Sequence, residues 1–214
     1  MAGSAFSEKF GIPRQSGLVE ELTAAVVFEP EYRDISALRG IEGFSHLWLI
    51  WEFSRSQGWS PTVRPPRLGG NKRLGVFATR SPFRPNPIGL SCVRLVEVHR
   101  DKALGPVLVV GGADLLDGTP IYDIKPYLPY ADCKPDAVGG FASIPKGADL
   151  AVDCPPKLLE AVPEDKRAAL LAVLAQDPRP QYQDDPARVY GMVFAGAEVK
   201  FRVEGDVLTV VEVL

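Results

Sequence analysis

The sequence predicts a mainly β protein: an N-terminal antiparallel β-barrel followed by a small α+β domain. Apolar segments of four to nine residues recur at short spacing, which is typical of barrels and sandwiches. No long helical pattern appears before residue 156, and the composition shifts near residues 136–148. We therefore expect a barrel domain over residues 1–139 and an α+β domain over residues 140–214.

The first domain is expected to contain short strands joined by stiff loops. Residues 44–53, FSHLWLIWEF, are apolar on both faces from Leu47 to Trp51, which predicts a central, fully buried strand. Asp34 is placed to cap a short helix in the preceding segment. The remaining strands or hairpins are expected at residues 18–28, 74–79, 88–99, 107–114 and 120–124, with an extended tail over residues 125–132.

The second domain contains the clearest helix of the chain, at residues 163–176. Glu164 and Asp165 fall in its first turn, and an apolar stripe follows. Three strands are expected after it, at residues 189–194, 199–203 and 207–213, with turns at Gly196 and Gly205.

The composition excludes several classes of protein. Two histidines and three scattered cysteines make a zinc site improbable and fit a reducing cytosol. No apolar run reaches the roughly 18 residues of a membrane helix, and no secretory signal pattern opens the chain. Neither a P-loop nor the βαβ alternation of a Rossmann fold occurs. We therefore expect a cytoplasmic protein that uses no metal and has no Rossmann domain.

The formal net charge of −3 hides a basic strip. The segment from Arg64 to Arg84 carries six positive charges and no acidic residue, whereas residues 149–185 are acidic. Such a strip can attract a phosphate-bearing ligand, although a solvated loop would have the same composition.

The segment GVFATRSPFRPNPIGLS, residues 75–91, is too rich in proline for a central strand. Pro82, Pro85 and Pro87 cannot donate to a sheet. Glycine permits close backbone approach to a ligand, and proline reduces the entropy lost on ordering. Similar loops occur at residues 13–17, 111–120 and 123–132. Each alone could be a barrel corner, but together they predict a preformed pocket.

Three runs resemble one family: FSHLWLIWEF, VRPPRLGGNKRLGVFATRSPFRPNPIGLS and DLLDGTPIYDIKPYLPYAD. They are similar to the TrmO (TsaA-like) family of S-adenosylmethionine-dependent tRNA methyltransferases. The later runs LAQDPRPQYQ and YGMVFAGAEVKFRV resemble the second domain of that family. Family members normally open with a strand that ends in an Arg-Ser-Pro turn. Only MAGSAFSE precedes KFGIPRQ here, so the first barrel strand is expected to be shortened or missing.

The resemblance implies a fold, an activity and partners. It implies a non-Rossmann barrel methyltransferase that forms a homodimer and binds S-adenosylmethionine. Its substrate would be N6 of N6-threonylcarbamoyladenosine, next to the anticodon of a threonine tRNA. Ser54 lies where a larger polar residue is usual. Carried over by motif, the cofactor site comprises Gln15, Ser16, Gly17, Phe53, Ser54, Arg80, Leu90, Gly111, Gly112, Ala113, Asp114 and Leu115.

Transfer of a methyl group from a sulfonium needs neither a metal nor a covalent intermediate, because alignment supplies much of the rate. The carbamoylated N6 still has to lose its proton. Asp114, Asp117 and Tyr127 are the candidates to accept or relay it, although turn capping would explain each aspartate equally well.

The RNA contacts are assigned to basic and polar residues of the strip and beyond it. Trp48 and Trp51 are expected in the core. A non-catalytic cofactor-sensing or RNA-binding module, or a methyltransferase for another substrate on the same barrel, remain alternatives. The predicted contacts to tRNA phosphates and sugars are Lys72, Arg73, Arg84, Asn86, Lys125 and Arg179.

Overall fold

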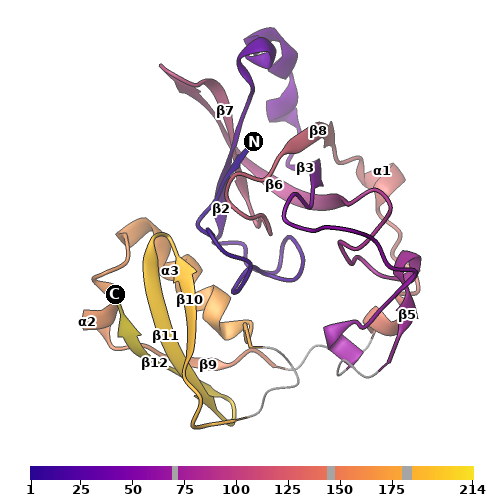
Figure 1. The fold of residues 1–214 in the computed structure, drawn as a ribbon. Helices are drawn as coiled ribbons and strands as arrows, with labels where there is room; N and C mark the ends of the chain where they lie inside the picture. The colour runs from indigo at the N-terminus through magenta and orange to yellow at the C-terminus, as the bar shows by residue number, and fades with distance from the viewer. Residues whose placement is uncertain (69–71, 144–147, 180–184) are drawn as a thin grey trace.

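The computed structural model describes residues 1–68, 72–143, 148–179 and 185–214, and it is mainly β (Figure 1). Within these residues, no helix has both the length and the apolar character needed to cross a membrane. The strands of the N-terminal part are β1 (Ala2–Gly3), β2 (Thr23–Val27), β3 (His46–Glu52), β4 (Thr62–Val63), β5 (Leu74–Gly75), β6 (Ile88–Asp101), β7 (Gly105–Gly111) and β8 (Ile121–Pro126). Its helices are η1 (Pro30–Tyr32), η2 (Ile35–Leu38), η3 (Ile41–Gly43), η4 (Pro66–Leu68), η5 (Val76–Ala78) and α1 (Pro129–Asp132).

Six of these strands form one antiparallel sheet in the order β1-β2-β7-β6-β3-β8. The two ends of the sheet approach each other through backbone hydrogen bonds. Ala2 N donates to Thr119 O at 2.9 Å, and Gly118 N donates to Ala2 O at 2.8 Å, just before β8 begins. The sheet therefore curls back on itself in the manner of a barrel. As expected, the first strand is short.

Side chains that point alternately to the two faces of each strand build the core of this sheet. Leu47, Leu49 and Trp51 of β3 point inward and are buried. The strand is central, because it pairs with both β6 and β8. The prediction that it is buried on both faces is wrong, because Trp48 and Ile50 on the other face are only partly covered.

The C-terminal part is a four-stranded sheet covered by a helix. Its elements are η6 (Gly140–Ser143), β9 (Ala151–Asp153), α2 (Pro156–Leu159), α3 (Glu164–Ala175), β10 (Tyr190–Phe194), β11 (Ala197–Glu204) and β12 (Val207–Val213). The sheet order is β10-β11-β12-β9, with β9 parallel to β12. Leu170 and Leu174 of α3 are fully buried in a core shared with Phe194 and Phe201. The predicted helix and three strands are confirmed, and β9 is an additional strand.

The segment between β1 and β2 packs on the C-terminal sheet. Phe6, Val19 and Leu22 belong to the C-terminal core. The Phe6 ring meets Phe194 edge-on at 5.5 Å, and Ala195 N donates to Ala5 O at 2.8 Å. Figure 1 shows this indigo segment running between the two sheets. The boundary between residues 139 and 140 stays a prediction, and residues 5–22 tie the two parts together.

Three local predictions were wrong and one was confirmed. Residues 74–79 form only the short β5, because Thr79 Oγ1 donates to Val76 O at 2.8 Å in a 3-10 turn. The tail after Pro126 closes into α1, where the Asp132 carboxylate accepts from Leu128 N at 2.9 Å. Residues 18–22 are not a strand. Asp34 caps η2 as expected, accepting from Ser36 N at 2.8 Å.

Candidate functional site

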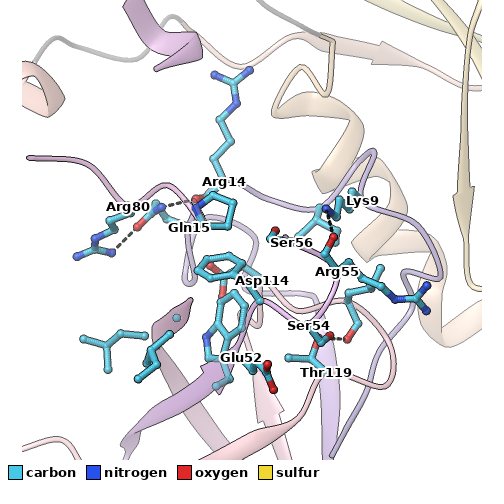
Figure 2. Close-up of a pocket in the computed structure, with 18 of the residues that line it drawn as sticks. Lys9, Arg14, Gln15, Glu52, Ser54, Arg55, Ser56, Arg80, Asp114 and Thr119 are labelled. Atoms are coloured by element: carbon cyan, nitrogen blue, oxygen red, sulfur yellow. Dashed lines mark hydrogen bonds between the residues drawn. The ribbon is translucent and has the colours of Figure 1, made fainter. Parts of the chain in front are cut away.

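A cavity of about 470 Å³ opens where four segments of the N-terminal part meet beside the barrel (Figure 2). Its walls come from residues 9–15, from 51–56 at the end of β3, from 79–90 and from 114–119. The volume falls within the range of small-molecule sites, about 300–1,000 Å³. The predicted cofactor residues that line it are Gln15, Phe53, Ser54, Arg80, Leu90 and Asp114.

Gln15 and Arg80 hold each other on one side of the cavity. The Arg80 guanidinium donates to Gln15 Oε1, and the Gln15 amide donates to the carbonyl of Arg14. Figure 2 shows this chain of hydrogen bonds facing Lys9, Arg55 and Ser54 across the cavity. The Arg80 side chain is therefore oriented before any ligand arrives.

Glycines 17 and 112 let two loops touch behind the cavity. Gly17 N donates to Gly112 O at 2.8 Å, and Gly112 N donates to Leu22 O at 2.7 Å. Gly112 has a φ of +73°, and a Cβ placed on it would lie 3.2 Å from Gly17 Cα. Ser16 Oγ accepts from Cys92 N at 3.1 Å. These predicted residues form the supporting wall of the cavity and are outside its immediate lining.

The segment that follows β7 alternates between core and cavity. Ala113 and Leu115 are buried in the barrel core. Asp114 and Leu116 point the other way and line the cavity. Gly111 closes β7 opposite Thr23 and Arg94. Of the predicted segment 111–115, the structure thus places one side chain, that of Asp114, on the cavity surface.

Asp114 is held by a directed chain of hydrogen bonds that sequence reasoning missed. Trp51 Nε1 donates to Ser91 Oγ at 2.9 Å, and Ser91 Oγ donates to Asp114 Oδ1 at 2.5 Å. An indole N–H can only donate, so the Ser91 hydroxyl hydrogen is directed at the carboxylate. Ser91 is completely buried. A serine on the inward face of a strand, between Gly89 and Val93, was the signal that could have revealed it.

Burial raises the pKa of the Asp114 carboxyl above its ordinary value. Hydrogen bonds from Ser91 and from backbone N–H groups, together with the positive charge of Arg80, oppose that rise. The outcome is a carboxylate with more affinity for a proton than an exposed aspartate has, held at the cavity wall by defined donors.

Asp117 and Tyr127 lie away from the cavity lining. Asp117 Oδ1 accepts from Ser4 N at 2.9 Å, which fixes the turn beside β1. The Tyr127 ring lies 5.8 Å from that of Trp48, and Tyr127 N donates to His46 O at the start of β3. The cavity is at the opposite end of that strand. Among the three proton-acceptor candidates, the geometry favours Asp114.

The predicted RNA contacts differ in how they are held. Arg84 lines the cavity, and its Nη1 donates to Thr79 O at 2.7 Å and to Val76 O at 3.2 Å. Arg73 donates twice to Thr62, to Oγ1 at 2.8 Å and to the carbonyl at 2.9 Å.

The remaining predicted RNA contacts come from other segments or are exposed. Lys125 pairs with Asp123 at 2.8 Å, and Arg179 pairs with Asp177 at 2.8 Å. Lys72 and Asn86 are exposed. The part of LAQDPRPQYQ from residue 180 onward lies outside the described residues.

The barrel-like sheet and its loop-built cavity define a class of ligand-binding β protein that differs from the Rossmann folds. Residues 1–133 match the family described as tRNA-methyltransferase O N-terminal domain, and residues 149–214 match the TrmO C-terminal domain. The chain belongs to the TrmO family, and the predicted resemblance is confirmed.

Proteins named as methyltransferases align with most of the chain. It is 45% identical over 212 residues to the tRNA (adenine(37)-N6)-methyltransferase of Escherichia coli K12, covering 94% of this chain and 89% of that protein. It is 51% identical over 164 residues to the enzyme of that name from Eikenella corrodens, covering 75% and 92%. A Pseudomonas aeruginosa relative, 43% identical over 88% of this chain and 84% of its own, is named putative S-adenosylmethionine-dependent methyltransferase RcsF.

Solved structures agree with this assignment. A crystal structure of TrmO superposes with a TM-score of 0.80 at 36% identity, over 99% of this chain and 93% of that one. The crystal structure of TrmO from Pseudomonas aeruginosa gives 0.79 at 33% identity, over 100% and 95%.

Proposed function

We propose that this chain is an S-adenosylmethionine-dependent methyltransferase that modifies N6 of adenine 37 in tRNA. The observation that carries the proposal is the cavity in which Gln15, Arg80 and Asp114 converge from three separate segments. The names of the Escherichia coli, Eikenella corrodens and Pseudomonas aeruginosa relatives support it. The finer proposal is that the substrate is N6-threonylcarbamoyladenosine in a threonine tRNA.

The cavity has the mixture of groups that S-adenosylmethionine requires. The cofactor carries a flat apolar base, ribose hydroxyls, an ammonium group and a carboxylate. Trp51, Phe53 and Leu90 offer apolar surface, while Asp114 can accept hydrogen bonds. Arg80, held by Gln15, is a donor suited to a carboxylate. The residues present therefore fit the group.

The bound cofactor supplies a methyl group that is already activated on sulfur. The loops have to orient the target base and exclude water from it, and their prolines and glycines fix that geometry in advance. We propose that Asp114 accepts the N6 proton as the new N–CH₃ bond forms. The raised pKa of this carboxyl suits a general base, because the pKa of an efficient base lies closer to neutral pH than that of an exposed aspartate.

The mouth of the cavity carries charge that suits RNA. Among the described residues that line it, five cationic side chains outnumber the two carboxyl groups, Glu52 and Asp114. The cationic residues are Lys9, Arg14, Arg55, Arg80 and Arg84. A cleft with this charge balance attracts the phosphates of a tRNA and raises the rate of encounter.

The test uses methyl-labelled S-adenosylmethionine and threonine tRNA with and without the threonylcarbamoyl group. We expect label to accumulate at position 37 of the modified tRNA alone. Asp114→Asn is the matched variant, because it keeps the size of the side chain and removes its charge. It should bind the cofactor but transfer at least about a hundredfold less label, the lower end of general-base effects.

Other outcomes separate the alternatives. Cofactor binding without label in either tRNA would support a non-catalytic sensor or RNA-binding module. Label in the unmodified tRNA would contradict the finer substrate proposal. The homodimer stays a prediction, which light scattering of the purified protein checks.

A further inference from the structure

One loop unit at the mouth of the cavity, the rim loop, comprises residues 59–63 and 74–84. Its two strands pair Thr62 with Gly75 in a short ladder. Ser60 N donates to Phe83 O at 3.1 Å, which ties its far end together. Thr79, Arg80, Pro82 and Arg84 of this unit line the cavity. Whatever the rim loop presents to solvent is therefore presented beside the reaction site.

The rim loop exposes three aromatic side chains. The exposed fractions are 58% for Trp59, 74% for Phe77 and 45% for Phe83. Large aromatic rings gain free energy on burial, so leaving three exposed in one stiff loop calls for a partner. The prolines and the backbone hydrogen bonds hold these positions without one.

Arg84 fixes Phe77 in place. Its Nη1 donates to the carbonyl groups of Val76 and Thr79, which come before and after Phe77 in the sequence. Its guanidinium carbon lies over the Phe77 ring, 5.6 Å from the centroid, at the distance of a cation–π contact. Arg84 is therefore engaged in shaping the loop and positioning Phe77, in addition to its predicted contact with RNA phosphates.

The charge of the surrounding segment indicates what kind of partner fits. Residues 64–84 contain six basic residues and no acidic one. Aromatic side chains beside cations are the means by which proteins bind unpaired nucleotides, with bases stacked on rings and phosphates neutralised nearby. The buried centre of a protein–protein interface is depleted in charge, and lysine in particular is rare there. The composition thus favours RNA over a second protein.

We propose that the rim loop is a stacking platform for unpaired bases of the anticodon loop, with Phe77 as the main contact and Arg84 as its positioning residue. The proposal rests on the proposed function, because it takes tRNA as the substrate. Beyond that function, it names the side chains that contact the anticodon loop around the target nucleotide. These contacts would recognise the loop by shape and stacking, without base-specific hydrogen bonds.

The test compares Phe77→Ala with Phe77→Tyr and with Tyr130→Ala. Tyr130 is 84% exposed but lies in α1, outside the rim loop, so it controls for the loss of any exposed ring. Dissociation constants for tRNA and for S-adenosylmethionine are measured at several salt concentrations. For Phe77→Ala we expect tRNA binding to weaken about tenfold, as for one lost base-stacking contact. Cofactor binding and kcat at saturating tRNA should be unchanged.

Further readouts separate a stacking role from a general structural one. Phe77→Tyr should restore tRNA binding, and Tyr130→Ala should leave it unchanged. The slope of log K against log salt should not change in Phe77→Ala, because no cation is lost. Arg84→Lys should weaken binding as much as Phe77→Ala does, and the double variant should be no worse than either, because the two residues act as one unit.

The opposite results would overturn the proposal. They are wild-type affinity for tRNA in Phe77→Ala, an equal loss in Tyr130→Ala, or a change in oligomeric state, which would make the rim loop a protein interface. A wild-type protein that binds tRNA through Phe77 but transfers no methyl group would uphold the platform and contradict the proposed function. Normal methyl transfer that does not depend on Phe77 would uphold the proposed function and contradict the stacking platform.

Discussion

The C-terminal core and the cavity beside the barrel are built by opposite rules. In the C-terminal core, apolar residues alternate along regular strands, as Val199, Phe201 and Val203 do along β11, and all three are buried. Around the cavity, Ser91 of β6 and Asp114 of the loop after β7 place polar groups in enclosed positions. The first arrangement maximises burial, whereas the second keeps hydrogen-bonding groups in fixed positions for a ligand.

The two regions should therefore respond differently to substitution. Changes in the C-terminal core should cost stability and leave ligand binding alone for as long as the protein folds. Changes at the cavity should affect binding or rate by more than their effect on stability, because polar groups held for a ligand do not maximise stability.

The largest effect on stability is expected from Phe201→Ala. The Phe201 side chain is fully buried and stacks on Tyr190 at 5.7 Å. Its removal leaves a cavity and should lower the free energy of unfolding by about 3–5 kcal/mol. Urea denaturation measures this, with the exposed Val207→Thr as a control expected within about 0.5 kcal/mol of wild type. A loss below about 1 kcal/mol in Phe201→Ala would show that this core is not what holds the C-terminal part together.

A smaller loss of stability with a larger loss of cofactor binding is expected from Gly89→Ala. A Cβ at Gly89 would overlap the indole ring of Trp51, which lines the cavity. The ring must move, at a cost of about 1–3 kcal/mol. Gly75→Ala is the matched control, because a Cβ there meets nothing within 4 Å and its φ is −58°. Equal cofactor affinities of the two variants by calorimetry would contradict the assignment of Trp51 to the site.

Ser91→Ala tests the hydrogen-bond chain. It leaves the buried Trp51 N–H without an acceptor, which should cost about 1–3 kcal/mol of stability. The rate of methyl transfer should also fall, because Asp114 loses the donor that orients it. Ser91→Thr keeps the hydroxyl group and should recover part of the rate. If Ser91→Ala and Ser91→Thr transfer methyl equally fast, the hydroxyl group has no role in positioning.

Asp114→Asn should reduce methyl transfer without destabilising the protein. Because burial raises the pKa of Asp114 in the folded state, this carboxyl binds more protons in the folded than in the unfolded state between the two pKa values. Wild-type stability should therefore fall, relative to the variant, as pH rises through the interval between the unfolded and folded pKa values. Thermal melts across that interval check the sign.

The pH dependence of the rate gives a second check on Asp114. The wild-type kcat/KM should increase as pH rises through the folded pKa, because the base acts when ionised. A flat profile together with normal turnover of Asp114→Asn would remove this residue from the chemistry.

The smallest effect is expected from Lys125→Ala. Lys125 forms an exposed ion pair with Asp123 at 2.8 Å. Such pairs contribute about 0–1 kcal/mol, so stability should barely change. If Lys125 contacts RNA as predicted, tRNA binding should weaken and the salt slope should fall by about one unit. An unchanged slope would remove it from the RNA surface.

The same contrast explains what could be predicted from the sequence. The strands β6, β10 and β12 and the helix α3 follow from the pattern of their apolar residues, and the position of β3 follows from its continuous apolar run. Among the cavity-lining residues, Gln15, Phe53, Ser54, Arg80, Leu90 and Asp114 were carried over from the family motifs. In the C-terminal part the packing of Phe6 was not predicted, because it depends on a contact with Phe194 far along the chain.

The side-chain geometry of the loops also could not be predicted from the sequence. Apolar Val76 and Phe77 read as strand, but Thr79 turns the chain through a hydrogen bond to Val76. Arg84 was predicted to contact RNA only, because nothing in the sequence indicates that it donates to two backbone carbonyl groups. Ser91 was missed because a lone serine in a strand has no motif, although its inward position marked it.

Hydrogen exchange of the protein with and without S-adenosylmethionine shows which loops form the cofactor site. If the cavity is the cofactor site, amides of residues 13–17, 53–56, 79–90 and 112–116 should gain protection, because ligand binding suppresses the opening of the loops that hold it. The strands β10, β11 and β12 should exchange at the same rate in both samples. Protection in the C-terminal sheet, with none in the cavity loops, would show that the cofactor binds elsewhere.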